Sequence, residues 1–297
     1  MIDLHIHTVA SDGQHTAAEI VAMAQAAGLF AIAIADHNSV ESVAEGEREA
    51  QKAGIGFAPA IEIDTIFRGR DLHLLGYFIA YDSTACQSYL EEIYRGKLDQ
   101  TRKRVARLNE LGFRLDFDEL MAESQGRLPT GKQYINLMKQ HPANMQNPDF
   151  RNFVDGPRSN SPYLNFYLDL LRAGRPAFIP LETQPTTAAI ARVRALGGVA
   201  VLAHPSDTPE ADVHALIDAG LQGLEVYTSY HQPADSERFL KLARDRGVLV
   251  TAGTDFHGRD IKPEVKFAEL PEARDEMFAA LKAAAERCQS LTLNTLC

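Results

Sequence analysis

Short apolar segments alternate with helix-like segments along most of this chain, and this alternation restricts its fold more than any other feature. The continuous apolar run Leu29–Ala35 is typical of a strand that is covered on both faces. The strands predicted in this way are residues 1–5, 29–35, 56–63, 72–79, 199–203, 224–227 and 248–252. About seven βα-type units favour an α/β fold, a parallel but irregular (β/α)7 barrel that is short of the usual eight strands.

The helices that alternate with these strands are marked by capping residues and end mostly at glycine. Thr16 and Glu19 form a capping-box pattern that predicts a helix ending at Gly28. Ser39 is the candidate cap of a helix that ends at Gly54, and Pro209 lies near the start of one that ends at Gly220. The remaining predicted helices of the barrel are residues 187–196, 234–246 and 271–287.

Residues 81–180 interrupt the alternation. They have a helical pattern, with a long polar helix near Gln87–Gly112 and a loop-rich stretch at His141–Pro162. We therefore predict a barrel made of residues 1–80 and 181–297, with a helical insertion of residues 81–180 between the fourth and fifth strands. The insertion carries 14 Lys and Arg against 12 Asp and Glu, whereas the whole chain has a net charge of -10. These charges fit either a solvated helical cap or a substrate lid whose few basic side chains reach an anionic ligand.

Composition excludes several classes of protein. A net charge of -10 argues against duplex nucleic acid as a partner, so an anionic substrate requires a local basic patch or metal ions. The three cysteines, Cys86, Cys288 and Cys297, are too few and too scattered for a disulfide framework or a thiolate zinc site. No apolar run is long enough to span a membrane, and the N-terminus lacks the features of a signal peptide, so we expect a cytoplasmic protein.

Histidines and carboxylates gather at the predicted strand ends. Seven of the ten histidines lie in or just after these ends: His5, His7, His37, His73, His204, His231 and His257. Four acidic residues accompany them: Asp12, Asp36, Glu62 and Asp255. Because the carboxyl ends of parallel strands meet on one face of a barrel, we expect these side chains to converge. Imidazoles and carboxylates without thiolates suit Mn, Fe, Zn or Co at a catalytic site.

These motifs resemble the PHP (polymerase and histidinol phosphatase) family of the amidohydrolase superfamily. The resemblance is carried by DLHIHTVASDG at 3–13, ADHNS at 35–39, the Glu62 strand, LHLLGY at 72–77, GGVAVLAHP at 197–205, GLEVYTSYH at 223–231 and GTDFHG at 253–258. The insertion after the fourth strand is similar to that of the nucleotide phosphatase and 5′-exonuclease branch.

The resemblance implies a site with two or three divalent metal ions. It makes His5, His7, Glu62 and Asp255 the ligands of one metal, and Glu62 a bridge to a second metal that His73 and His204 also hold. It makes Asp12, His37 and His257 the ligands of a third. Asp36 is expected to orient His37 or another ligand.

The resemblance also implies hydrolysis of a phosphate ester. Clustered divalent ions lower the pKa of a water molecule and offset the charge of the phosphoryl oxygens. His231 or His257 is a candidate to protonate the leaving group, and we favour His231 because the family assigns His257 to a metal. The candidates to hold a second phosphate are Arg127, Lys132, Arg158 and Arg175. The segment at 126–132 lacks a histidine that the branch commonly carries, and Arg175 replaces a family lysine.

Several substrates remain open at this point. The leading class is a small nucleotide or short single-stranded RNA, by removal of the 3′-phosphate from a 3′,5′-bisphosphonucleotide or by 5′–3′ exoribonuclease cleavage. The alternatives are hydrolysis of histidinol phosphate or of a cyclic phosphodiester, and, in another class, a non-catalytic metal-binding module. The sequence leaves open the metal identity, the oligomeric state and the role of residues 155–162.

Overall fold

The computed structural model describes residues 1–295, with side chains through Ser290. Cys297, which the composition argument counted, lies outside the described residues. One sheet of seven strands, ordered β1 to β7, curls into a nearly closed barrel. The strands are β1 (Ile2–Ile6), β2 (Ala31–Ile34), β3 (Gly56–Phe67), β4 (Arg70–Tyr77), β5 (Val199–Leu202), β6 (Gly223–Tyr227) and β7 (Leu249–Ala252). The predicted α/β barrel, with its long insertion between the fourth and fifth strands, is confirmed.

The expectation of an entirely parallel barrel was wrong at β4. This strand pairs antiparallel with both β3 and β5, while the other paired strands are parallel. The reason is the connection between β3 and β4, which consists of only Arg68 and Gly69, both with positive φ. Such a two-residue turn suits the twist of an antiparallel hairpin, and a parallel crossover needs a far longer connection. The hairpin also makes β3 longer than predicted.

Hydrogen bonds between β1 and the segment after β7 complete the wall. The amide of Asp255 donates to the His5 carbonyl at 2.8 Å, and the amide of His7 donates to the Phe256 carbonyl at 2.9 Å. Residues distant by about 250 positions in the sequence are thereby held side by side. This junction pairs the segment of His5 and His7 with the segment of His257.

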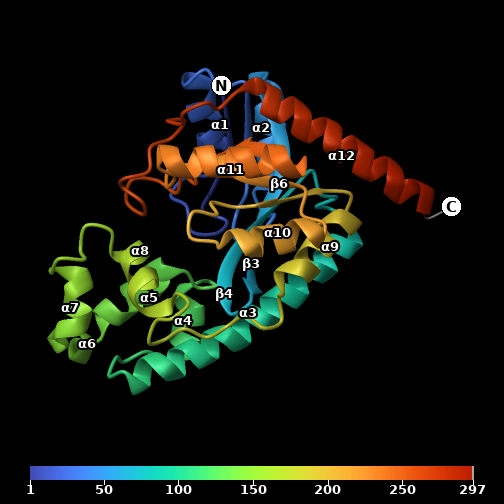
Figure 1. The fold of residues 1–297 in the computed structure, drawn as a ribbon. Helices are drawn as coiled ribbons and strands as arrows, with labels where there is room; N and C mark the ends of the chain where they lie inside the picture. Colours follow the sequence, from blue (N-terminus) through green and yellow to red (C-terminus); the bar gives the residue numbers. More distant parts are fainter. Residues whose placement is uncertain (296–297) are drawn as a thin grey trace.

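Both faces of the barrel wall are buried, as the apolar run at 29–35 predicts. Ala31 and Ala33 of β2 point into the interior cluster, whereas Ile32 and Ile34 pack outward with residues of the first two helices. The surrounding helices are α1 (Ala17–Ala26), α2 (Val43–Ala53), α9 (Thr186–Ala195), α10 (Glu210–Asp218), α11 (Pro233–Arg246) and α12 (Asp275–Thr295), seen in Figure 1. Phe278 and Leu281 of α12 close the interior cluster.

Two helix starts differ from the prediction. The capping box of Thr16 and Glu19 is present at α1. Ser39 does not cap α2, because that helix begins four residues later, after Ser42. The final helix begins at Asp275 rather than near Pro271, and its first carboxylate pairs with the amino group of Met1 at 2.7 Å.

The insertion begins with one long helix and continues in short ones. Helix α3 (Thr84–Glu110) leaves the barrel and leads to a separate group of helices (Figure 1). These are α4 (Phe117–Glu123), α5 (Gly131–Gln140), α6 (Pro142–Gln146), α7 (Pro148–Val154), α8 (Pro162–Phe166) and the π-helix η1 (Tyr167–Leu171). They pack around their own apolar cluster, which includes Leu120, Phe150 and Phe166. The stretch expected to be loop-rich holds α6 and α7, because a proline begins each one and His141 and Asn147 cap them. Among the described residues, no helix is long and apolar enough to cross a membrane.

Candidate metal centre

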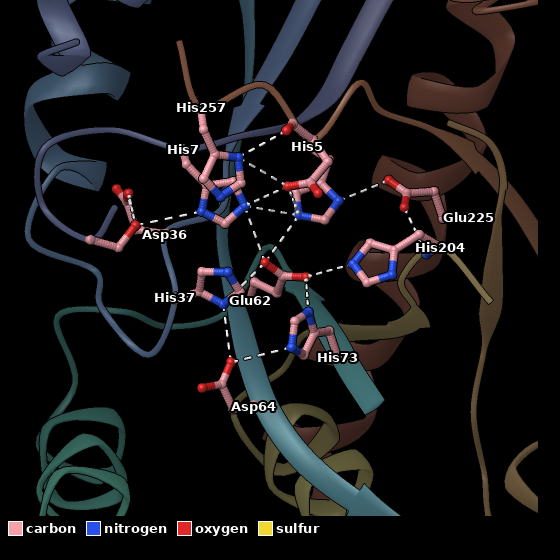
Figure 2. Close-up of polar contacts among 12 residues, drawn as sticks. His5, His7, Asp36, His37, Glu62, Asp64, His73, His204, Glu225 and His257 are labelled. Carbon is pink, nitrogen blue, oxygen red and sulfur yellow. Dashed lines mark hydrogen bonds and ion pairs between the residues drawn. The ribbon is translucent and has the colours of Figure 1, made fainter. Parts of the chain in front are cut away.

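The predicted histidines and carboxylates converge at one end of the barrel (Figure 2). Glu62 of β3 lies at the middle of the group, completely buried, with imidazoles around both of its oxygens. His5 and His7 are also completely buried, and they reach this point from β1 because residues two apart on a strand point the same way. The convergence that the sequence predicted for residues far apart in the chain is present.

One carboxylate oxygen of Glu62 faces the two β1 histidines. Its Oε2 lies 3.2 Å from His5 Nε2 and 3.1 Å from His7 Nε2. Asp255, just after β7, places Oδ1 3.0 Å from His7 Nε2. The four potential ligand atoms of His5, His7, Glu62 and Asp255 lie within 4.8 Å of one another. This is the set that the family resemblance assigned to a first metal.

The other oxygen of Glu62 faces the histidines assigned to a second metal. Its Oε1 lies 3.0 Å from His73 Nδ1 and 3.2 Å from His204 Nε2. His73 occupies the first half of β4, where a parallel strand would have no site residue. Because β4 runs antiparallel, its first half lies at the same end of the barrel as the last residues of its neighbours. Glu62 is therefore placed between two groups of histidines.

A third group of potential ligands is formed by Asp12, His37 and His257 together with His7. Asp12 Oδ1 is 3.2 Å from His257 Nε2, and His37 Nδ1 is 3.3 Å from Glu62 Oε2. The ligand atoms of His7, Asp12, His37 and His257 lie within 4.8 Å of one another. The third predicted set is thus assembled, with His7 shared between it and the first.

Several of these atoms are buried and lack a hydrogen bond. Among the described residues, Glu62 Oε2, His73 Nδ1, Asp255 Oδ1 and His257 Nε2 have no hydrogen-bond partner, although other polar atoms lie close by. Buried polar atoms are rarely left in this state, and a divalent cation bound by imidazole and carboxylate would satisfy all of them. The residues present therefore fit metal ions.

The charges of the group support the same conclusion. Burial raises the pKa of Glu62, but the imidazoles of His37, His5 and His73 outweigh it and hold that pKa well below its ordinary value. Burial lowers the pKa of His257 to about 4, so its imidazole is neutral at pH 7, as a metal ligand must be. Burial also acts to lower the pKa of His37, but Glu62 and two aspartates raise it to about 10. Negative and positive groups are thus held close together at this end of the barrel.

Comparison with known proteins agrees with this geometry. Residues 3–152, just over half of the chain, match the family model described as the PHP domain. The chain belongs to the PHP domain family. It is an enzyme of this phosphoesterase hydrolase family, as the resemblance predicted.

Three curated relatives of this PHP protein have different substrates. The chain is 28% identical over 271 residues to a 3′,5′-nucleoside bisphosphate phosphatase of Chromobacterium violaceum, which covers 88% of this chain and 90% of that protein. It is 27% identical to a phosphoribosyl 1,2-cyclic phosphate 1,2-diphosphodiesterase of Eggerthella lenta, over 86% of this chain and 94% of the relative. It is 24% identical to a 5′-3′ exoribonuclease of Haemophilus influenzae, over 86% of this chain and 89% of the relative.

A solved structure shares the whole fold. A protein from Bifidobacterium adolescentis, assigned as a metal-dependent phosphoesterase, has a TM-score of 0.75 and 25% sequence identity. The match covers 95% of this chain and 96% of the other. The shared architecture therefore includes the insertion as well as the barrel.

Two acidic residues of the PHP site were not predicted. Glu225 of β6 accepts from His5 Nδ1 at 3.0 Å and from the His204 amide at 2.8 Å, so it orients two histidines at once. Asp64 lies 3.0 Å from His37 Nδ1 and 2.5 Å from Lys97 Nζ of α3. Asp64 follows Glu62 by two positions on the same face of β3, and that spacing was a signal the sequence offered. Lys97 had no local signal, because only the docking of α3 brings it to the site.

Asp36 and His231 both make hydrogen bonds outside the group of predicted ligands. The carboxylate of Asp36 accepts from the Thr8 amide and hydroxyl, both at 2.7 Å, and from Ser11 Oγ at 2.6 Å. These bonds fix the loop that carries the predicted ligand Asp12, and Ser42 Oγ donates to the same carboxylate. His231 donates from Nδ1 to the Val226 carbonyl at 2.8 Å and stacks on Phe239.

A cleft of about 600 Å³ opens from the PHP site toward the insertion. Its barrel side includes Asp12, His37, His73 and His204. Of the four predicted phosphate-binding residues, Arg127 and Lys132 line the cleft. Among the described residues, Arg158 and Arg175 do not line the cleft. Arg158 forms a bidentate pair with Asp169, and Arg175 is exposed. The insertion instead contributes Lys97 and Arg104, which the sequence analysis did not select.

Proposed function

We propose that this PHP enzyme hydrolyses a phosphate ester of a small nucleotide or a short single-stranded oligonucleotide. The observation that carries the proposal is the position of the clustered ligands at one end of a cleft whose other wall is basic. Arg127 and Lys132 line that wall and Lys97 lies beside Asp64 near the ligands, so a substrate with two phosphates would be held at both ends. This arrangement favours a 3′,5′-bisphosphonucleotide 3′-phosphatase or a 5′–3′ exoribonuclease.

The cofactors in this proposal are two or three divalent ions, with Mn, Fe and Zn as the candidates. His5, His7, Glu62 and Asp255 would hold one ion, and Glu62 with His73 and His204 a second. Asp12, His37 and His257 would hold a third. Such ions lower the pKa of water and offset phosphoryl charge. The residues of this chain would position the ester: Lys97 and Arg127 bind its phosphates, and Asp36 keeps the loop of Asp12 in place.

His231 is the candidate to protonate the leaving group. Burial lowers the pKa of His231, and its Nδ1 is committed to Val226, so the imidazole is neutral at pH 7. This favours a structural role for His231 over a role as general acid. An activity assay of a His231 variant distinguishes the two roles. Replacing His231 by Asn keeps the hydrogen bond to Val226. A general acid predicts a loss of 100-fold or more in kcat with a poor leaving group and little loss with p-nitrophenol.

A second candidate substrate is a cyclic phosphodiester. The relative from Eggerthella lenta, at 27% identity, acts on a phosphoribosyl cyclic phosphate, and this favours it over histidinol phosphate. A non-catalytic metal-binding module fits poorly, because every predicted ligand position is occupied by a suitable side chain.

The test combines metal analysis with a panel of substrates. We expect two or three ions per chain and turnover of adenosine 3′,5′-bisphosphate or of a 5′-phosphorylated oligoribonucleotide. Cyclic phosphodiesters and histidinol phosphate complete the panel. Replacing Glu62 by Ala removes both metals and activity, whereas the exposed Glu237→Ala control keeps them. Metal without turnover of any ester, or full activity of Glu62→Ala, would refute the proposal.

A further inference from the structure

Within the part of the chain that the structure describes, three residues outside the metal centre each place a buried polar atom without a hydrogen-bond partner in the cleft: Gln100, Arg104 and Tyr134. Gln100 of α3 is 3% exposed, and its Nε2 donates to the Ile179 carbonyl at 2.6 Å. Because a carbonyl only accepts, this bond fixes the amide orientation and leaves Oε1 as a free acceptor. Within residues 1–290, Gln100 Oε1 and Arg104 Nε are both buried without a hydrogen-bond partner. Both residues line the cleft.

Tyr134, Tyr167 and Leu171 line the same cleft as Gln100 and Arg104, and so does Asp71. Gln100 and Arg104 are four residues apart on α3 and so lie on one helix face. Burial raises the pKa of the Tyr134 and Tyr167 phenols, and the charge of Arg104 acts to lower both pKa values. Leu171 also lines the cleft, and it comes with Tyr167 from the π-helix η1. We name the group Gln100, Arg104, Tyr134, Tyr167 and Leu171 the α3 pocket.

The α3 pocket lies beyond the metal centre and not within it. Asp71 lies two residues before His73 on β4, a separation of about 7 Å along a strand. Arg104 acts electrostatically on Asp71, whereas Lys97, seven residues earlier on α3, contacts Asp64 beside the metal ligands. Seven residues of helix span about 10 Å. A group in the α3 pocket is therefore roughly one sugar away from an ester at the metals.

The chemistry of the pocket suits a heteroaromatic base. A guanidinium N–H and an amide oxygen on one face offer one donor and one acceptor, which matches the edge of a nucleobase. A phosphate has only acceptors, so it would leave Gln100 Oε1 unpaired and oppose it. Flat aromatic walls with few polar groups are usual for a bound ring.

We propose that the α3 pocket binds the base of a nucleotide substrate through Arg104 and Gln100. The proposal rests on the proposed function and deepens it, because it names the part of the substrate that the insertion recognises. It gives the insertion a role beyond covering the metal centre, since its first helix would recognise the base while the barrel binds the ester.

The experiment compares substrates with and without a base. Arg104→Met and Gln100→Met remove the two polar groups, and the neighbouring Lys103→Met, exposed and paired with Asp99, is the matched control. We expect the KM for adenosine 3′,5′-bisphosphate to rise about tenfold or more in both cleft variants. Their KM for the abasic 1-deoxyribose 3,5-bisphosphate stays unchanged, and Lys103→Met changes neither. An equal rise with both substrates, or no rise, overturns the proposal.

Calorimetry of nucleosides with the metal-free protein separates this idea from the proposed function. We expect adenosine or guanosine to bind the wild type and Lys103→Met, and to bind Arg104→Met at least tenfold more weakly. Binding of this kind without turnover of any nucleotide would leave the pocket standing and remove the proposed function. If nucleotides are turned over but nucleoside binding is absent or does not depend on Arg104, the proposed function stands and the α3 pocket proposal is overturned.

Discussion

Gly253 packs directly against His5 at the junction that closes the barrel. A β-carbon at position 253 would lie 2.2 Å from His5 Cβ and 2.7 Å from Glu225 Oε1. Both neighbours belong to the metal centre, and the contacts with His5 involve its Cβ and its backbone nitrogen, which cannot rotate away as the end of a side chain can. The histidines of the β1 segment can reach the segment that follows β7 only because residue 253 has no side chain.

Replacing Gly253 by Ala therefore damages both the fold and the site. We expect a loss of about 3 kcal/mol or more in the free energy of unfolding, since the closely packed junction has no room to relax. Metal content falls as well, because His5 must move. Urea unfolding and elemental analysis provide the measurements. Gly174→Ala, at an open position with positive φ, is the control and costs about 1 kcal/mol with no loss of metal. Normal metal content in Gly253→Ala would contradict this account.

Glu225 positions two histidines without being one of the predicted ligands. In Glu225→Gln the side chain keeps its size and still accepts from the His204 amide, but it loses the charge that faces His5 Nδ1. We expect metal affinity to fall roughly 10- to 100-fold. Competition with a coloured chelator measures the affinity, and circular dichroism checks the fold. An unchanged affinity would mean that Glu225 only fills space.

The sequence predicted the convergence of the histidines and carboxylates better than their surroundings. Glu62 and His204 were identifiable because each lies at the end of a predicted apolar strand within a distinctive motif. The direction of β4 was missed because it depends on the two-residue turn at Arg68 and Gly69, which the strand pattern alone does not weigh. Lys97 was missed for another reason, since its place beside Asp64 arises from the packing of a helix that has no site motif.

Metal loading of the free protein should depend strongly on pH. Burial acts to lower the pKa of His5, but the carboxylates of Glu62, Glu225 and Asp255 hold it well above the ordinary value. The pKa of His37 is raised to about 10 in the same way. At pH 7 the metal-free protein therefore holds protons that a metal must displace, and affinity rises up to roughly tenfold per pH unit for each proton released.

The same shifts set the stability of the metal-free protein. A raised pKa in the folded state stabilises the fold fully below the ordinary value near 6.5, and this contribution is lost as pH rises toward 10. We expect the gap in Tm between metal-loaded and metal-free protein to widen between pH 6.5 and 9. Scanning calorimetry across this range, and proton release measured in buffers of different ionisation enthalpy, are the tests. A pH-independent affinity would show that the imidazoles are already neutral.

Arg127 and Arg158 provide a matched pair for the anion-binding wall. Both belong to the insertion and both were selected from the sequence, but only Arg127 lines the cleft, where it also donates to the Val9 carbonyl and pairs with Glu41. We expect Arg127→Met to raise the KM of a bisphosphate at least tenfold while leaving that of p-nitrophenyl phosphate nearly unchanged, since a second phosphate loses its charged partner. Arg158→Met breaks only a half-exposed pair with Asp169, which is worth about 1 kcal/mol or less of stability, and its kinetics stay those of the wild type. Equal effects of the two variants on the bisphosphate would remove Arg127 from the substrate site, because Arg158 does not line the cleft.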